Sequence, residues 1–282
     1  SLSINSENIY VSDNIGFVYS INLNSGNVNW VKNHGIPIKS SIKVFDNKIY
    51  FINQDNRILC LDAKDGSLLW GRRSISSFIK SQGFLSIAIS ESGELFSLTS
   101  SGELQKINSK NGNILWSLNI TDMSSSISAD FFKSSEIVII GSDLVFSTSS
   151  SLFSFNTVNG YLNWKIDLSS GSTPIIDGKY IFAVSDDGYF LNVEKDTGKI
   201  IWSKNILKIL KKRKRNTNIS GFILGSGKAY ITTLNGYLIV CSANTGNIEY
   251  FKKISKTITA PPIIAESSLY VISSESKVLG FN

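Results

Sequence analysis

The chain has 282 residues, of which 42% are hydrophobic and 18% charged, and its formal net charge is +6. This length allows a large buried core, and no apolar run approaches the roughly 18 residues of a membrane-spanning helix. The first residues have neither the basic nor the apolar region of a secretory signal peptide, which leaves two expectations: a cytosolic protein, or a chain that begins after a processing site.

A pattern of glycine, three residues and an aromatic residue recurs along the chain. Gly66-Ser67-Leu68-Leu69-Trp70 is one copy, and successive copies are 38 to 48 residues apart. A polar residue precedes each glycine by four positions, and all five tryptophans occupy the aromatic slot. Repetition at this period indicates one supersecondary unit used several times. The slot is filled by Trp30, Trp70, Trp116, Trp164, Trp202 and Tyr250.

The residues of the pattern predict a hairpin and a packing seam. Glycine at a fixed offset supplies the positive φ of a tight turn, and the polar residue ahead of it can hydrogen-bond the turn backbone. An indole has a large apolar surface and one N–H that needs a partner. We therefore expect the tryptophans to lie between neighbouring units, in one geometry copied six times. In five units a further aromatic residue precedes the slot by twenty positions.

Taken in chain order, each unit is predicted to form four short strands, A to D. Antiparallel four-stranded units at this period close into a β-propeller, which protects its sheet edges by radial packing. The sequence thus predicts an all-β fold with seven blade units and a single domain over residues 1–282. The predicted units span residues 1–33, 36–73, 84–119, 134–168, 172–205, 219–253 and 261–282.

The seventh unit has strands A, B and C and lacks the glycine, the aromatic residue and strand D. Leu2–Ser6 aligns with strand A of the second unit, so it is committed to strand A of the first. We therefore expect strand C of the seventh unit, at Val278–Asn282, to be an exposed edge. We also expect the native protein to have an upstream segment that supplies the missing strand, with or without one further blade.

Few residues fit catalysis or metal binding. Cys60 and Cys241 fall in the third strands of the second and sixth units, so we expect free, buried thiols. His34, the only histidine, follows a D strand and has no Ser or Cys partner in view, which favours a surface role over general-base chemistry. Asp186-Asp187-Gly188 has the composition of a hairpin turn. There is no zinc spacing and no phosphate-binding loop.

Asp/Asn-x-x-(Thr/Ser/Asn)-Gly-x-x-x-Trp, with a B strand such as Lys179–Val184, resembles the quinoprotein (PQQ-like) repeat. Proteins with this repeat include both enzymes and scaffolds. The PQQ-dependent dehydrogenases carry a vicinal disulfide, a calcium held by Glu and Asn, and a catalytic Asp. This chain has no adjacent cysteines and no acidic cluster outside turns. We predict a non-enzyme without catalytic residues, cofactor or metal; a quinoprotein-type oxidoreductase or its inactive relic is the alternative.

The last sixty residues are similar to the final two units of the BamB family of outer-membrane assembly lipoproteins, in its α-proteobacterial form. The similarity lies in Gly221–Tyr230, Asn235–Leu238, Ala260–Ala265 and Leu269–Ile272. Members of that family have a lipidated N-terminal cysteine and eight blades, of which this chain matches the last seven. The resemblance implies a periplasmic scaffold, lipid-anchored in the full-length protein. It implies binding to the periplasmic repeats of a BamA-like subunit, with unfolded outer-membrane proteins as a further expected partner.

The resemblance also implies where the partner binds. The family's contact surface is an apolar and basic segment that leaves a D strand near mid-chain, with acidic residues in the next connection between blades. The matching positions here are Arg72, Arg73, Ile75 and Phe78, followed by Asp130. The alternative for the two arginines is a solvated loop. Apolar residues beside the charges favour a contact surface.

The run from Lys208 to Arg215 lies between the fifth and sixth units and carries a charge equal to the net excess of the chain. We expect Ile209 and Leu210 to pin the start of this loop to the body of the protein. Anionic lipid headgroups or an acidic partner are the expected ligands; a solvated loop that only aids solubility is the alternative. Nucleic acid is not expected, because no aromatic residues interleave the run. The basic residues are Lys208, Lys211, Lys212, Arg213, Lys214 and Arg215.

Overall fold

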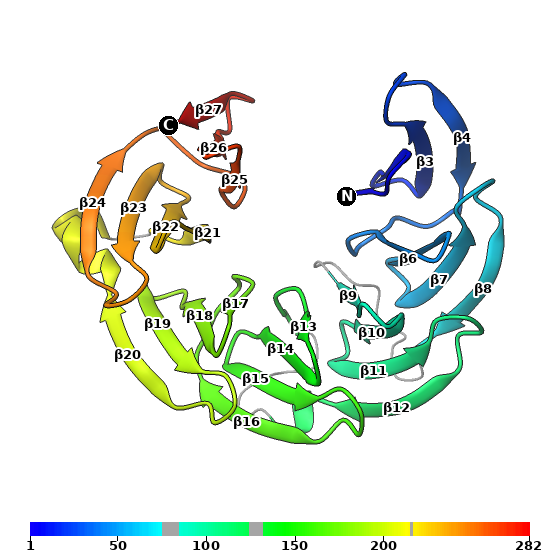
Figure 1. The fold of residues 1–282 in the computed structure, drawn as a ribbon, viewed down its shortest axis with the longest axis horizontal. Coiled ribbons are helices and arrows are strands. Elements are labelled where there is room, and N and C mark those ends of the chain that lie inside the picture. The colour runs from blue at the N-terminus through cyan, green and yellow to red at the C-terminus, as the bar shows by residue number, and fades with distance from the viewer. Residues whose placement is uncertain (75–84, 124–131, 215–216) are drawn as a thin grey trace. The chain divides into compact units, whose positions relative to one another are not determined.

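The regular structure of the chain is almost entirely β (Figure 1). The computed structural model describes residues 1–74, 85–123, 132–214 and 217–282. In these ranges the strands form seven antiparallel sheets, six with four strands and the last with three. We call the sheets blades 1 to 7 and their strands A to D in chain order. The blades coincide with the seven predicted units, including the missing strand D of the last.

Consecutive strands are hydrogen-bonded neighbours within every blade. Blades 1 to 3 contain β1 (Leu2–Ile4), β2 (Asn8–Ser12), β3 (Phe17–Asn22), β4 (Val28–Asn33), β5 (Lys43–Phe45), β6 (Lys48–Ile52), β7 (Arg57–Asp62), β8 (Leu68–Arg73), β9 (Ser86–Ile89), β10 (Glu94–Leu98), β11 (Glu103–Asn108) and β12 (Ile114–Asn119). Blades 4 to 7 contain β13 (Val138–Ile140), β14 (Asp143–Ser147), β15 (Ser151–Asn156), β16 (Leu162–Asp167), β17 (Ile175–Asp177), β18 (Tyr180–Val184), β19 (Tyr189–Glu194), β20 (Ile200–Asn205), β21 (Ile219–Gly225), β22 (Lys228–Thr233), β23 (Tyr237–Ser242), β24 (Ile248–Lys253), β25 (Ile263–Ala265), β26 (Ser268–Ile272) and β27 (Val278–Phe281).

The chain divides into two compact units. The first comprises residues 1–145 and 155–162 and contains blades 1 to 3. The second comprises residues 146–154 and 163–282 and contains blades 5 to 7. Blade 4 has residues in both. The single domain expected over residues 1–282 stays a prediction. Two 3-10 helices, η1 (Thr121–Met123) and η3 (Ile206–Lys214), are described, and neither is long and apolar enough to cross a membrane.

Strand C of blade 2 shows why the predicted strands bunch apolar residues. Because side chains alternate between the faces of a strand, Leu59 and Leu61 point toward blade 1 and join the hydrophobic cluster of Tyr10. Ile58 and Cys60 point toward blade 3 and join the next cluster. Both faces of a blade are therefore buried, which requires a continuous apolar run rather than alternation with polar residues.

The C–D turns follow the predicted chemistry. Gly66 has φ +73°, and the five equivalent glycines have values between +70° and +74°. The Asp62 side chain accepts a hydrogen bond from the Lys64 backbone N–H at 2.8 Å. The C–D pairing shifts register between Cys60 and Leu61, so the hairpin contains a bulge.

The tryptophan of one blade packs against the C–D turn of the next. Trp70 Nε1 donates to the Ser109 backbone oxygen at 3.0 Å, and the Tyr50 hydroxyl donates to the same oxygen at 3.3 Å. Gly112 lies against the indole, and a Cβ at this glycine would be 2.7 Å from the ring. The other pairs of indole and backbone oxygen are Trp30–Ala63 (3.1 Å), Trp116–Thr157 (3.2 Å) and Trp164–Lys195 (2.7 Å).

The expectation of one geometry copied six times is wrong for the last two copies. Trp202 Nε1 is buried without a hydrogen-bond partner among the described residues, and its ring meets Phe190 edge-on at 5.0 Å. Tyr250 is 50% exposed. The hydrogen bond therefore forms in four of the five tryptophan copies, because it depends on where the next turn places its carbonyl group, and the sixth copy has a tyrosine in place of the indole.

The terminal strands are arranged as the sequence predicts. β1 pairs with β2, in register from Leu2–Val11 to Ile4–Ile9. β27 pairs with β26 and with no other strand in the described part of the chain. The outer side of β27 is thus the edge of its sheet.

Candidate interaction surfaces

The end of β8 is the first candidate surface, and the structure gives its two arginines different surroundings. Arg72 Nε donates to the Gly112 backbone oxygen at 2.9 Å, and its terminal nitrogen donates to Asn113 Oδ1 at 2.8 Å. Arg72 is therefore tied to the C–D turn of blade 3. Arg73 is exposed and lies opposite Arg57 in the strand register. Of the pair, Arg73 is the residue whose charge faces solvent with no hydrogen bond or ion pair in the described part of the chain.

The remaining predicted partner-binding residues, Ile75, Phe78 and Asp130, lie outside the described residues. Of the five residues predicted for this surface, the structure thus places Arg72 and Arg73 at the end of β8, with their side chains on opposite faces of the blade.

A buried polar network lies beside the end of β8. Ser74, the residue after this strand, donates its hydroxyl hydrogen to the Glu103 carboxylate. Glu103 also accepts from Gln105 Nε2 at 2.8 Å and from Ser117 Oγ at 2.9 Å. A buried carboxylate persists where donors satisfy it, so the network fixes the point at which the chain leaves β8. Sequence reasoning missed it; the signal was an acidic residue where the other C strands begin with other residue types.

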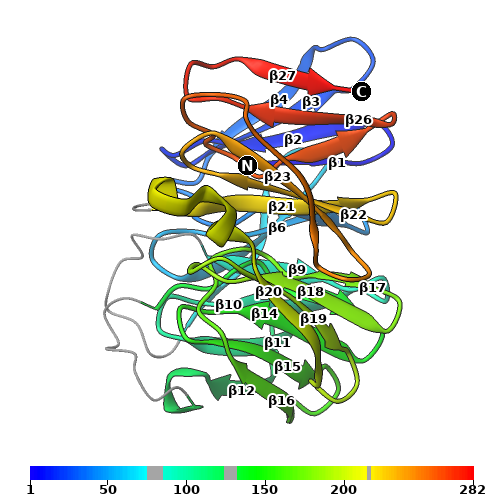
Figure 2. The same cartoon turned by 90° about the vertical axis from the view of Figure 1, so that its left-hand side faces the viewer.

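The basic connection between blades 5 and 6 is a 3-10 helix, η3, which corrects the expected loop. Ile206, Leu207 and Leu210 are at most 3% exposed and belong to the hydrophobic cluster between these blades. Ile209 packs against the same cluster. The start of the segment is therefore pinned to the body, as predicted from Ile209 and Leu210. Figures 1 and 2 show η3 as a yellow coil beside the strands of blade 6.

One basic residue of blade 6 contacts the hydrophobic cluster that holds η3. Lys208 is exposed, and its backbone N–H donates to Asn205 Oδ1 at 3.1 Å. At the end of β24, Lys252 and Lys253 are exposed as well, but Lys252 pairs with Leu238 and so lies on the face of blade 6 turned toward blade 7. Lys253 Nζ lies 5.6 Å from the ring centre of Tyr237, a member of the cluster that holds η3. Arg215 lies outside the described residues.

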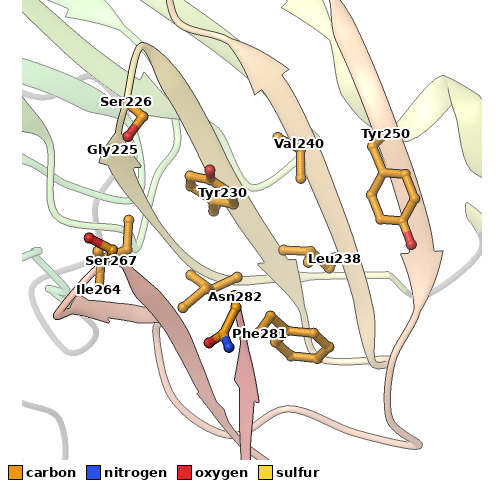
Figure 3. Close-up of a pocket in the computed structure, with 11 residues that line it drawn as sticks. Gly225, Ser226, Tyr230, Leu238, Val240, Tyr250, Ile264, Ser267, Phe281 and Asn282 are labelled. Carbon is orange, nitrogen blue, oxygen red and sulfur yellow. The ribbon is translucent and has the colours of Figure 1, made fainter.

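A cavity of about 330 Å³ lies between blades 6 and 7 (Figure 3). Its wall is mostly apolar, with Leu238 and Val240 from β23 and Phe281 from β27. The Tyr250 and Tyr230 side chains are its aromatic lining in blade 6. No side chain of His, Cys, Asp or Glu is among its lining residues, and its polar groups are the hydroxyls of Tyr230, Tyr250, Ser226 and Ser267 and the Asn282 amide.

The two residues considered for catalysis or metal binding, His34 and Asp186, make contacts that stabilise the fold. His34 is half-buried against Phe51, with 5.9 Å between the two ring centres. Burial lowers the pKa of His34, and the positive charge of Lys32 lowers it further. Asp186 accepts from Ser169 Oγ at 2.8 Å and from the Gly171 N–H at 3.0 Å, so it ties its hairpin to the preceding connection. In the described ranges no group of three His, Cys, Asp or Glu is placed to hold a metal ion.

The two cysteines are free and buried, as predicted. Burial raises the pKa of Cys60 to about 12 and that of Cys241 to about 12. A catalytic or metal-binding cysteine requires the thiolate, which an apolar environment disfavours. Both thiols therefore act as small apolar groups of the blade cores.

The chain is similar to proteins of one family over most of its length. The family model described as "Outer membrane protein assembly factor BamB" matches residues 3–204. The protein of that name from Moranella endobia (strain PCIT) is 20% identical over 94% of this chain and 70% of its own length. The protein of that name from Yersinia pestis is 19% identical over 90% of this chain and 66% of its own length.

A solved structure has the same fold as this chain. The crystal structure of BamB from Moraxella catarrhalis superposes with a TM-score of 0.83 at 12% identity, over 99% of this chain and 83% of that one. The seven sheets are thus the blades of a β-propeller of the BamB type. Because the family model matches more than half of the sequence, the chain belongs to the BamB family of outer membrane protein assembly factors.

Proposed function

We propose that this protein is a non-catalytic scaffold of the β-barrel assembly machinery, on the periplasmic side of the outer membrane. In this role it binds the periplasmic repeats of a BamA-like subunit, assists the insertion of outer-membrane proteins and contacts their unfolded chains. In the full-length protein a lipid would anchor it. The observation that carries the proposal is the family match, together with relatives that are named outer membrane protein assembly factors.

The end of β8 and the residues that follow are the proposed surface for the BamA-like subunit. Arg73 is exposed there, and the sequence continues with Ile75 and Phe78. Charged residues around apolar ones are typical of interface anchors. The hydrogen bond from Ser74 to the buried Glu103 supports this choice, because it fixes the base of the segment and reduces the entropy lost on binding.

A binding measurement tests the proposal. We expect the periplasmic repeats of a BamA-like subunit to bind this chain in isothermal titration calorimetry. Arg73→Glu combined with Phe78→Ser should weaken binding at least about tenfold, as loss of interface anchors does. Lys64→Glu, in an exposed turn of the same blade, is the matched control and should bind like the unmodified chain. No binding by the unmodified chain would refute the partner; equal binding by all three would refute the surface.

The surroundings of the reactive groups support a non-catalytic role. His34 packs on an aromatic ring, Asp186 braces a turn, and both thiols lie in blade cores. None of them lines the cavity between blades 6 and 7. The oxidoreductase alternative is tested by mixing the chain with PQQ and Ca²⁺ and removing the unbound quinone. We expect no quinone absorbance to stay with the protein; retained absorbance would contradict a non-catalytic role.

A further inference from the structure

The cavity between blades 6 and 7 lies where the five preceding seams hold a C–D turn. In those seams the turn glycine of the following blade lies against the slot tryptophan, so that a Cβ would be within 3.0 Å of the ring. The pairs are Trp30–Gly66, Trp70–Gly112, Trp116–Gly160, Trp164–Gly198 and Trp202–Gly246. Tyr250 fills the slot in blade 6 and lines the cavity instead, together with Phe281 and Asn282 of blade 7 (Figure 3). The cavity is therefore the place that a C–D turn takes in the other seams.

The first group that fits a turn in this place is the Ser267 carbonyl. In blades 2 and 6 the backbone N–H at the start of the C–D turn donates to the residue just before strand B: Ala63 donates to the Asn47 oxygen and Ala243 to the Gly227 oxygen, both at 2.9 Å. Ser267 directly precedes strand B of blade 7, and it lines the cavity. Its backbone oxygen is thus the acceptor for an N–H of the occupant.

The second group is the Tyr230 hydroxyl. By the strand register, Tyr230 of β22 occupies the position of Tyr50 in β6. The Tyr50 hydroxyl donates to the Ser109 backbone oxygen in the C–D turn of the next blade at 3.3 Å. Tyr230 lines the cavity and presents the same donor. One residue of an occupant can therefore be held twice, through its N–H by Ser267 and through its C=O by Tyr230.

β27 extends this seat as a strand edge. By register, Val278 and Gly280 correspond to Ile58 and Cys60 of β7, which lie opposite β8 in blade 2. In the described part of the chain β27 pairs with β26 alone, so the side that β7 offers to β8 is an unpaired edge in β27. Such an edge presents N–H and C=O groups that a further strand can bond. We call Ser267, Tyr230, Tyr250 and β27 together the acceptor site.

We propose that the acceptor site binds a polypeptide segment that turns at a glycine on Tyr250 and continues as an extended strand along β27. The other seams define its chemistry: a glycine, three residues and an aromatic residue, with an apolar residue for the wall formed by Leu238 and Val240. A polypeptide fits better than a small apolar molecule, because the site continues beyond the cavity as backbone groups that bind a strand. The proposal does not depend on the BamA-like partner, so the two tests fail independently.

A peptide added in trans tests the proposal directly. The peptide has the sequence of Ala63–Arg73, which forms the turn and strand D of blade 2, with an acetylated N-terminus and fluorescein at the other end. Fluorescence anisotropy should show saturable binding to the unmodified chain. Gly66→Val in the peptide should weaken binding at least about tenfold, because a β-branched residue resists the positive φ and meets the Tyr250 ring. No saturable binding, or equal binding of the two peptides, would overturn the proposal.

Backbone methylation separates strand pairing from other contacts. The Ser74 N–H donates to the Asn56 oxygen at 3.3 Å, and bonded pairs alternate along an antiparallel ladder, so the Arg72 N–H faces strand C and the Gly71 N–H faces away. N-methylation of the peptide at Arg72 should weaken binding more than about tenfold, since it removes a hydrogen bond and places a methyl group against β27. The matched peptide methylated at Gly71 should change binding less than about threefold. Equal losses would mean that the peptide does not pair with β27.

Variants of the protein locate the seat of the turn. Tyr250→Ala should weaken peptide binding at least about tenfold, as loss of an aromatic anchor does. Tyr230→Phe keeps the ring and removes one hydrogen bond, so it should weaken binding about fivefold and tests the site even if Tyr250→Ala perturbs blade 6. The control, Tyr161→Ala, removes a tyrosine that is 73% exposed in the C–D turn of blade 4 and should bind like the unmodified chain. Unchanged binding by both cavity variants would overturn the seat.

Two outcomes would assign the acceptor site to another occupant and contradict the proposal. If the unmodified chain sediments as a dimer and does not bind the peptide, a second copy fills the site. If the dye 8-anilinonaphthalene-1-sulfonate binds, depends on Tyr250 and is not displaced by the peptide, the cavity takes small apolar molecules.

Discussion

The slot residues Trp70 and Tyr250 occupy the same position of the repeat in very different seams. Trp70 donates to Ser109, lies near Tyr50 with 6.1 Å between ring centres, and is covered by the next glycine turn. Tyr250 is 50% exposed at a cavity of about 330 Å³. The aromatic residue does not make the seam alone. It needs the C–D turn of the following blade, which supplies the glycine and the carbonyl group.

Truncating both aromatic residues should give the largest difference in unfolding free energy between the two seams. Trp70→Ala should cost about 3–5 kcal/mol of unfolding free energy, because it leaves a cavity and removes one of the two hydrogen bonds that the Ser109 backbone oxygen accepts. Tyr250→Ala should cost about 1 kcal/mol or less, since half of this side chain is already in water. Urea unfolding followed by circular dichroism measures both. Similar losses would mean that the two seams are energetically alike.

The glycine on the indole can be tested with a matched glycine elsewhere. Gly112 and Gly227 both have φ +72°, but a Cβ would meet the Trp70 ring at Gly112 and open space at Gly227. Alanine at Gly227 should cost about 1–2 kcal/mol for the left-handed backbone. Alanine at Gly112 adds about 1–3 kcal/mol for the clash. If thermal or urea denaturation gives equal losses, the turn does not press on the indole.

The indole hydrogen bond can be isolated from the indole surface. Trp164→Phe removes the 2.7 Å bond to Lys195, whereas Trp202→Phe removes an N–H that has no partner among the described residues. Loss of a buried bond adds about 1 kcal/mol to the cost of the smaller ring. Trp164→Phe should therefore destabilise by about that much more. An equal or larger effect at Trp202 would show that its N–H is paired in solution.

The smallest expected effect concerns the thiols. Cys60 lies opposite Trp70 in the register of β7 and β8. Its pKa of about 12 lies above that of an unfolded thiol, so its contribution to stability is complete below pH 9 and is lost as the pH rises toward 12. Native alkylation should be slow at both cysteines. Trp70→Ala should speed it at Cys60 and leave Cys241 unchanged; unchanged rates at both would mean that the seam does not shield Cys60.

Most of the fold could be predicted because the repeat is local. Glycine, a polar residue four positions earlier and an apolar run fix a hairpin within some thirty residues, so the seven blades and the incomplete last sheet follow from spacing. The seam at Trp70 followed from the same pattern. The missing hydrogen bond at Trp202 could not be predicted, because the sequence identifies the indole N–H donor and does not give the position of the acceptor.

The candidate surfaces could be predicted less well, for the same reason. The basic run was visible, but the 3-10 helix that contains it depends on packing between blades 5 and 6. Arg72 looked like a free charge next to Arg73, and only the structure shows its guanidinium on Gly112 and Asn113. Contacts between units that are 40 residues apart in sequence carry no local signal.

The acceptor in each tryptophan seam is a backbone oxygen, and this has a consequence for how the sequence can diverge. The four acceptors belong to Ala63, Ser109, Thr157 and Lys195, whose side chains differ in size, polarity and charge. Any amino acid at these positions presents the same carbonyl group, so substitutions there leave the bond intact. Substitutions at the acceptor positions therefore leave the seam unchanged. This helps to explain how a relative with 12% identity can share the same fold.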